Sequence, residues 1–164
     1  MNIVKMIVAV AVFALAEAAS SETLTYWTNA SGDGQWGTAE NWDPIYPADA
    51  GCVAVFTNSA SLATGTSPCS IRVTQGEVTL TPSGAVTGRD DPSTHDFVID
   101  VAADASFTWA NASAYVYGAS TARFVKKGEG TAKISSRISH WSMASRIFKS
   151  VEVEGGTLQV GDIV

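Results

Sequence analysis

Residues 151–160 read VEVEGGTLQV, and this stretch has the clearest period-two alternation in the chain. Valines alternate with glutamates over its first four positions, which is the period of a half-buried β-strand. Two glycines then provide a turn, and Leu158 and Val160 resume the apolar side. The stretch therefore predicts two short strands joined by a tight turn.

The same pattern recurs at regular intervals along the chain. Segments with alternating apolar residues begin at positions 76, 105, 130 and 156, which are 29, 25 and 26 residues apart. The last step also places Val125 on Val151. A repeat of this size is typical of solenoids, in which each turn covers its neighbour. We therefore predict an all-β fold, a β-helix-like solenoid of about four short rungs. The alternative is an antiparallel sandwich whose hairpins resemble one another.

The first eighteen residues have the pattern of a secretory signal peptide. Lys5 is followed by an apolar run and then by Ala16-Glu17-Ala18, a small-x-small cleavage pattern. The apolar run is shorter than the roughly 20 residues of a membrane-spanning helix, which argues against an integral membrane span. We expect three parts: a signal peptide at 1–18, a Trp-rich N-terminal capping segment at 19–57, and solenoid repeats at 58–164 with a loop at 135–150.

Export would place Cys52 and Cys69 in an oxidising compartment. Two cysteines in an exported chain usually pair, so we predict a disulfide between them. Closing so short a loop contributes roughly 3 kcal/mol in the chain-entropy treatment. The alternative is two buried thiols. A zinc site has little support, because no second cysteine pair and no nearby histidine complete a ligand set.

The N-terminal part of the chain holds three of the five tryptophans. A solenoid needs a cap over its open end, and large aromatic residues are usually buried. We therefore expect these aromatics to form a small core over the first coil. Two alternatives stay open, an adhesive patch and a platform on which sugars stack. The candidate stacking residues are Trp27, Trp36, Trp42 and Tyr46.

One segment follows the spacing of an EF-hand calcium loop. Asn29, Ser31, Asp33, Gly34 and Glu40 take the positions of the loop ligands and its glycine. Few of these residues carry a formal charge, and their flanks are β-like rather than helical. We therefore predict neither a metal site nor a cofactor.

The net charge and the sequence motifs argue against several classes of function. The formal net charge of -6 argues against nucleic acid as a partner, since such affinity rests on basic residues. His95 beside Asp96 is the only acid–base pair that stands out, and its neighbours are typical of a solvated turn. The sequence contains no nucleophile elbow, phosphate-binding loop or zinc-protease motif. We expect no catalytic activity.

Two regions together resemble a known family. The first contains Tyr26-Trp27, the Gly-Asp-Gly turn ending at Gly34, and Asn41-Trp42, before a Val-rich strand. The second reads VKKGEGTAKIS from residue 125 and VEVEGGTLQVGD from residue 151. The chain thereby resembles secreted bacterial proteins with autotransporter-associated β-strand repeats.

The resemblance implies a β-helix passenger at the outer membrane surface of a bacterium, with no catalytic residues to carry over. The two cysteines and the long loop between the repeat halves depart from the family pattern. Family members are usually much longer, which implies a truncated piece.

We therefore expect a secreted or cell-surface protein with a structural, adhesin-like function, whose partner is a surface glycan or a protein. The alternative is a carbohydrate-binding module that uses exposed Trp or Tyr side chains of residues 26–46.

Overall fold

The computed structural model of the chain describes residues 22–47, 51–64, 69–83, 86–87, 96–110, 115–117, 121–135, 137–138 and 148–161. The predicted signal peptide, most of the predicted loop at 135–150, and His95 lie outside the described residues. The described chain is nearly all-β, and its stacked parallel strands form a β-solenoid of about four turns. The predicted fold class is confirmed, and parallel pairing excludes the antiparallel sandwich.

The strands lie on three faces of the coil. The first face is a seven-stranded sheet, the second has five strands, and the third has three. The first face contains, in sheet order, β14 (Ser150–Val153), β11 (Arg123–Lys127), β8 (Phe97–Val101), β5 (Ser70–Val73), β3 (Cys52–Phe56), β1 (Thr23–Trp27) and β2 (Trp42–Asp43). The second contains β15 (Thr157–Val160), β12 (Thr131–Ile134), β9 (Ala105–Trp109), β6 (Gly76–Pro82) and β4 (Ala60–Thr64). The third contains β13 (Arg137–Ile138), β10 (Tyr115–Tyr117) and β7 (Val86–Thr87).

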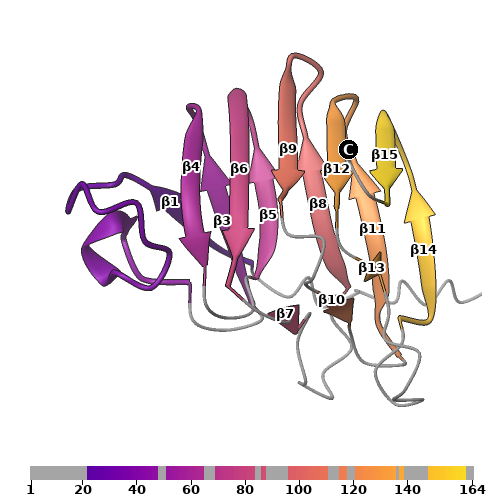
Figure 1. Cartoon of the computed structure of the whole chain (residues 1–164), viewed down its shortest axis with the longest axis horizontal. Coiled ribbons are helices and arrows are strands. Elements are labelled where there is room, and N and C mark those ends of the chain that lie inside the picture. Colours follow the sequence, from indigo (N-terminus) through magenta and orange to yellow (C-terminus); the bar gives the residue numbers. More distant parts are fainter. Residues whose placement is uncertain are drawn as a thin grey trace, which may run out of the picture.

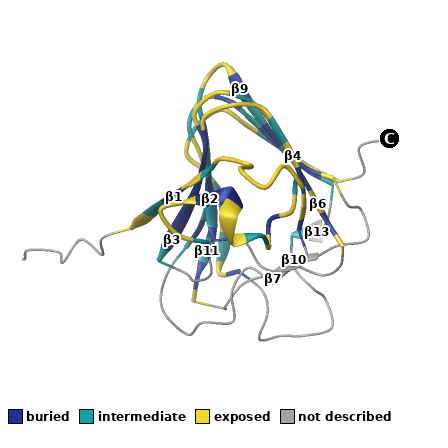
Figure 2. Ribbon diagram, turned by 90° about the vertical axis from the view of Figure 1, so that its left-hand side faces the viewer, coloured by how far each residue is buried: buried dark blue, intermediate teal, exposed yellow. Residues whose placement is uncertain are grey.

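The stack runs along the long axis of the molecule, from β1 at one end to β14 and β15 at the other (Figure 1). Figure 2 looks along this axis from the end that carries β1, and the two larger sheets form long sides that meet at a corner. The only helix in the described part of the chain is a short 3-10 turn, Ala39–Asn41. The scarcity of helical periodicity in the sequence agrees with this finding.

Apolar side chains stack in columns through the interior. On the second face, Leu62, Leu80, Trp109 and Ile134 occupy the same inward position on successive rungs, and each is almost fully buried. Because strand side chains alternate between faces, every second residue of each repeat must be apolar to continue such a column. This requirement explains the period-two pattern from which the fold was predicted.

The repeat register is confirmed on the second face and wrong by one residue on the first. The predicted steps of 29, 25 and 26 residues are the pairings of β6, β9, β12 and β15. On the first face, however, Val151 pairs with Phe124 instead of Val125. Four residues separate Lys126 from Thr131, whereas three separate their pairing partners in the last rung. A single repeat length therefore cannot align both faces when the corner between them differs in length from rung to rung.

Glycines form the corners between the first and second faces. A Cβ atom on Gly130 would lie 2.1 Å from the carbonyl oxygen of Ala102, and one on Gly156 would lie 2.3 Å from that of Gly130. Gly156 also has a φ of 62°, a left-handed conformation that favours glycine. The glycine turn at 155–156 is therefore a corner between two sheets and not the tip of a hairpin.

The stack begins earlier than the repeat does. β1 and β3, which lie within the predicted capping segment, pair in parallel with each other, and β3 pairs in parallel with β5. β2 then pairs antiparallel with β1 and forms the last strand of this sheet. The capping segment thus supplies strands to the solenoid as well as the aromatic residues that cover it.

Candidate interaction surfaces

The tryptophans of the N-terminal segment form a core with Phe56, here called the aromatic cluster (Trp27, Trp36, Trp42 and Phe56). The ring centroids of Trp36 and Trp42 are 4.6 Å apart, and those of Trp27 and Trp42 are 5.0 Å apart. The indole N–H of Trp42 donates to the carbonyl oxygen of Trp36 at 2.8 Å. Edge-to-face packing of this kind stabilises buried aromatic groups beyond their area alone. The aromatics cover the first rung, as the sequence predicts for a cap.

Burial decides which of the candidate stacking residues can meet a sugar. Trp36 is 0% exposed and Trp42 is 5% exposed, so neither can present a ring face to a ligand. Trp27 and Tyr46 are partly buried against the core. The large side chains exposed at this end are Tyr26 and Ile45. A stacking platform in residues 26–46 would therefore depend on Tyr26, with Trp27 and Tyr46 at most in part.

A buried asparagine, Asn41, organises the loop with EF-hand-like spacing. Its Oδ1 accepts hydrogen bonds from the backbone N–H of Ser31 at 3.0 Å and from the Ser31 hydroxyl at 2.7 Å. Its Nδ2 donates to Asp33 Oδ1 at 2.7 Å and to the carbonyl oxygen of Gln35 at 3.0 Å. Our sequence interpretation missed this residue, because we considered it only as part of a family motif.

Asp33 is the second centre of this network. It accepts hydrogen bonds from the Thr38 hydroxyl at 2.6 Å and from the backbone N–H of Gln35 at 2.9 Å, besides the bond from Asn41. These donors favour the ionised carboxylate and hold the pKa of Asp33 far below its ordinary value. The oxygens that would face a calcium ion in an EF-hand are here acceptors for the chain's own donors. Within the described residues, no group of three or more His, Cys, Asp or Glu gathers as metal ligands do.

Cys52 and Cys69 are buried on neighbouring rungs. Val53 pairs in parallel with Ser70, so the residues that precede them are also neighbours. Adjacent strands lie about 4.7–4.9 Å apart, which is inside the range of about 4.4–6.8 Å between the Cα atoms of a disulfide. The structure places no bond between the two sulfur atoms, and the disulfide stays a prediction.

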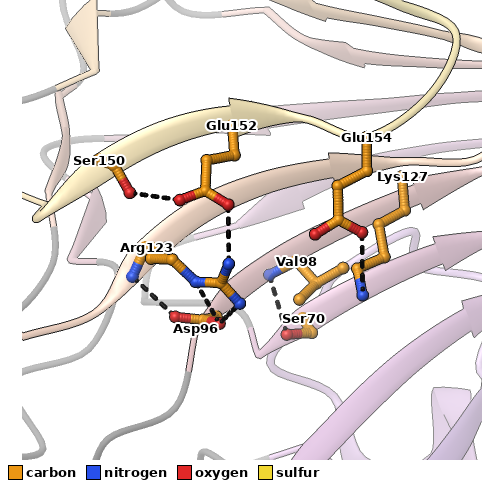
Figure 3. Close-up of polar contacts among 8 residues, drawn as sticks. All are labelled: Ser70, Asp96, Val98, Arg123, Lys127, Ser150, Glu152 and Glu154. Atoms are coloured by element: carbon orange, nitrogen blue, oxygen red, sulfur yellow. Dashed lines mark hydrogen bonds and ion pairs between the residues drawn. The ribbon is translucent and has the colours of Figure 1, made fainter.

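Charged side chains form ladders across the outer side of the first face (Figure 3). Arg123 bridges two rungs: its Nη2 lies 2.6 Å from Asp96 Oδ2, and its Nη1 lies 2.7 Å from Glu152 Oε2. In another row, Arg72 lies 3.4 Å from Asp100, and Lys127 lies 3.3 Å from Glu154. Positive and negative charges therefore alternate from rung to rung along the stack.

The ladder changes the acid–base properties of Asp96. Burial opposes ionisation of its carboxyl group, but hydrogen bonds and positive charge from Arg123 outweigh burial and hold the pKa of Asp96 below its ordinary value. The hydrogen bond and charge of Asp96, together with the charge of Glu152, raise the pKa of Arg123. Both groups are therefore charged at neutral pH, and the rungs are held in register.

One lysine lies inside the coil. Lys126 pairs with Ile99 in the inward row of the first face and is fully buried. Its Nζ donates to the carbonyl oxygens of Lys127 at 2.5 Å, Gly128 at 2.6 Å and Gly155 at 3.2 Å. Burial lowers its pKa. Lys126 thus ties together the corners of two successive rungs, a role that the sequence pattern did not indicate.

Within the described residues, the last members of the apolar columns lie on β14 and β15, which we call the open edge. Val151, Val153 and Val160 are 49%, 53% and 53% exposed, although they continue inward columns whose earlier members are buried. In the part of the chain that the structure describes, nothing pairs with the far side of β14 or β15. The two ends of the solenoid therefore differ in chemistry.

Comparison with known proteins finds no family model, no curated protein and no solved structure that matches this chain. The resemblance to autotransporter-associated repeats therefore stays an expectation. Within the described residues, no helix is both long and apolar enough to cross a membrane. The surfaces described above have to be interpreted on their own chemistry.

Proposed function

We propose that the protein is a secreted or cell-surface β-solenoid with a structural and adhesive function and no catalytic activity. One observation carries this proposal: buried columns run through the rungs while charged ladders fix their register outside. Such a stack holds its faces at fixed positions along an axis. A rigid body of this kind suits the presentation of a binding surface.

Export is the first part of the proposal to test. The experiment follows the protein in cells that express the full chain, with and without deletion of residues 2–18. We expect protease added to intact cells to degrade the full chain while a cytosolic marker survives, or the chain to accumulate in the medium. The N-terminus of the exported product should lie near Ala19. Retention of the full chain inside intact cells, with its N-terminus unprocessed, would contradict the proposal.

Adhesion is the second part. Purified protein on beads should bind to immobilised glycans or to surface proteins. Binding should survive Tyr26→Ala if the solenoid faces are responsible. The carbohydrate-binding alternative rests on the 40% exposure of Tyr26. It predicts that Tyr26→Ala abolishes binding to a glycan, because aromatic stacking needs that ring. Measurable hydrolysis of any bound glycan would contradict the absence of catalytic activity.

A further inference from the structure

The loop between β1 and β2 contains a motif that the proposed function does not use. Residues 29–31 read Asn-Ala-Ser, and all three are exposed. An asparagine followed two residues later by serine or threonine, with no proline between them, is the acceptor pattern for N-linked sugars in secreted proteins. A second triplet of this kind begins at Asn111, which lies outside the described residues.

The side-chain amide of Asn29 is oriented for modification. Its Oδ1 accepts a hydrogen bond from the backbone N–H of Gly34 at 3.1 Å. The oxygen and nitrogen of a carboxamide lie on opposite sides of its carbon, so this bond turns Nδ2 away from Gly34. Within the described residues, Nδ2 of Asn29 has no hydrogen-bond partner. A sugar on Nδ2 would therefore leave the bond that shapes the loop intact.

The other two described asparagines each lack one of these properties. Asn41 is buried, and its Nδ2 donates two hydrogen bonds, which a sugar would disrupt. Asn58 is exposed, but its triplet ends in Ala60, which has no hydroxyl group. Among the described asparagines, Asn29 alone combines exposure, an unbonded amide nitrogen and a serine in the third position.

The contacts of Ser31 indicate when a sugar would be added. In the folded loop, the Ser31 hydroxyl donates to Asn41 Oδ1 at 2.7 Å and accepts a hydrogen bond from the backbone N–H of Asp33 at 3.3 Å. An enzyme that recognises this hydroxyl finds it already bonded once the loop has closed on Asn41. The hydroxyl is open to such an enzyme only before the loop folds, which is the state of a chain during export.

We propose that Asn29 carries an N-linked sugar, attached during export before the N-terminal loop folds. The donor is an activated sugar whose anomeric carbon is bonded to a phosphate oxygen, and a cellular glycosyltransferase catalyses the transfer. The bond from Nδ2 to the anomeric carbon forms, the bond from that carbon to the phosphate oxygen breaks, and the phosphate leaves with the proton that Nδ2 loses. The inference rests on the export part of the proposed function, and it places a polar group at the capped end of the solenoid.

The test uses the full chain, purified from the cells that produce it naturally and analysed by mass spectrometry of its peptides. We expect the exported form to carry an added mass of one hexose or more on the peptide that contains Asn29. Assignment to single peptides separates this site from Asn111. The chain that lacks residues 2–18 should stay inside the cell and carry no sugar at Asn29.

Two pairs of variants identify the acceptor. Asn29→Asp removes Nδ2, keeps the oxygen that Gly34 contacts, and tolerates the left-handed conformation at φ 53°, so only the modification should be lost. Asn58→Asp makes the same change at an exposed asparagine outside a triplet and should leave the sugar on Asn29. Ser31→Ala should lose the sugar, whereas Ser31→Thr keeps a hydroxyl and should retain it. Circular dichroism would establish that the variants fold.

The outcomes separate this inference from the proposal of export. An exported chain with its N-terminus near Ala19 and an unmodified Asn29 would overturn the inference and leave export standing. A chain that stays inside intact cells without a sugar would overturn both. A sugar that persists on Asn29 in Ser31→Ala, or in the chain without residues 2–18, would overturn attachment through this triplet during export.

Discussion

The two ends of the described solenoid differ in how their inward apolar side chains are covered. At the N-terminal end, β2 pairs antiparallel with β1, and the aromatic cluster fills the interior of the coil. At the other end, the inward valines of β14 and β15 are about half exposed. A stack of identical rungs has no natural end, so each end needs its own solution. The described residues cover the N-terminal end with aromatic side chains and leave the inward valines of the last described rung partly exposed.

The difference in burial between the two ends indicates which residues stabilise the fold most. The N-terminal segment is irregular in sequence, yet it holds the fully buried Trp36 and a dense polar network. The last described rung has a clear alternating pattern, yet its side chains Val151, Val153 and Val160 are about half exposed. The repeated pattern therefore predicts the solenoid, whereas the non-repeating N-terminal segment stabilises one of its ends.

The largest predicted loss of stability follows from truncation of a buried aromatic side chain in the cap. Trp36→Ala should destabilise the protein by about 3–5 kcal/mol, as truncation of a buried Trp usually does. Val153→Ala, at the open edge, should cost less than about 1 kcal/mol, because the side chain is already half exposed. Urea unfolding followed by circular dichroism compares the two. Similar costs at both sites would mean that the open edge is covered in solution.

The next effect concerns the polar network beneath the cap. Asn41→Ala removes two donated and two accepted hydrogen bonds and leaves Asp33 and Gln35 without their buried partner. We expect a cost of about 1–3 kcal/mol, typical of buried polar groups that lose a partner. Asn58→Ala, at an exposed site, is the matched control and should change the free energy of unfolding little. Equal effects would show that the network is dispensable.

Acid should weaken the N-terminal cap through one residue, Asp33. The folded-state pKa of Asp33 lies below its ordinary 3.8, because Thr38, Gln35 and Asn41 donate to its carboxylate. Its contribution is therefore complete above pH 4 and is lost as the pH falls through the lower, folded-state pKa. Unfolding measured between pH 5 and pH 2 should show a shallower pH dependence in Asp33→Asn than in the wild type.

Thr38→Val tests the same contribution without changing the formal charge. It removes the hydroxyl donor to Asp33, so the pKa of Asp33 should rise toward 3.8, and the acid-dependent loss of stability should become smaller and end at a higher pH. An unchanged pH profile in both variants would assign the acid sensitivity to Asp96 and its ion pair with Arg123 instead.

Sequence periodicity was sufficient to predict the solenoid, since buried columns require apolar residues at alternate positions and at fixed steps. It failed at the corner after Lys126, where one additional residue shifts the register of β11 against β14. The interior position of Lys126 was also missed. A lysine breaks the apolar pattern, and only the three-dimensional corner shows the carbonyl oxygens that its ammonium group meets.

The candidate site was less predictable than the fold. The tryptophans were recognised as a possible cap, but their burial, which removes Trp36 and Trp42 as stacking residues, depends on packing against Phe56. The exposure of Val151 and Val153 follows from their place in the stack, which the alternating pattern alone does not show. Both failures concern contacts between residues far apart in the chain, which local patterns do not encode.

The smallest predicted change in the free energy of unfolding is the difference between substitutions at two buried indoles, Trp42 and Trp109. The N–H of Trp42 donates to the carbonyl oxygen of Trp36, whereas the N–H of Trp109 finds no hydrogen-bond partner among the described residues. Trp42→Phe therefore loses a hydrogen bond, and Trp109→Phe removes a polar group whose burial is unfavourable. We expect Trp42→Phe to cost about 1 kcal/mol more than Trp109→Phe in urea unfolding. If Trp109→Phe is the more damaging change, close packing in the interior rungs outweighs the unsatisfied N–H, and the contrast between the cap and the rungs lies in packing rather than in polar contacts.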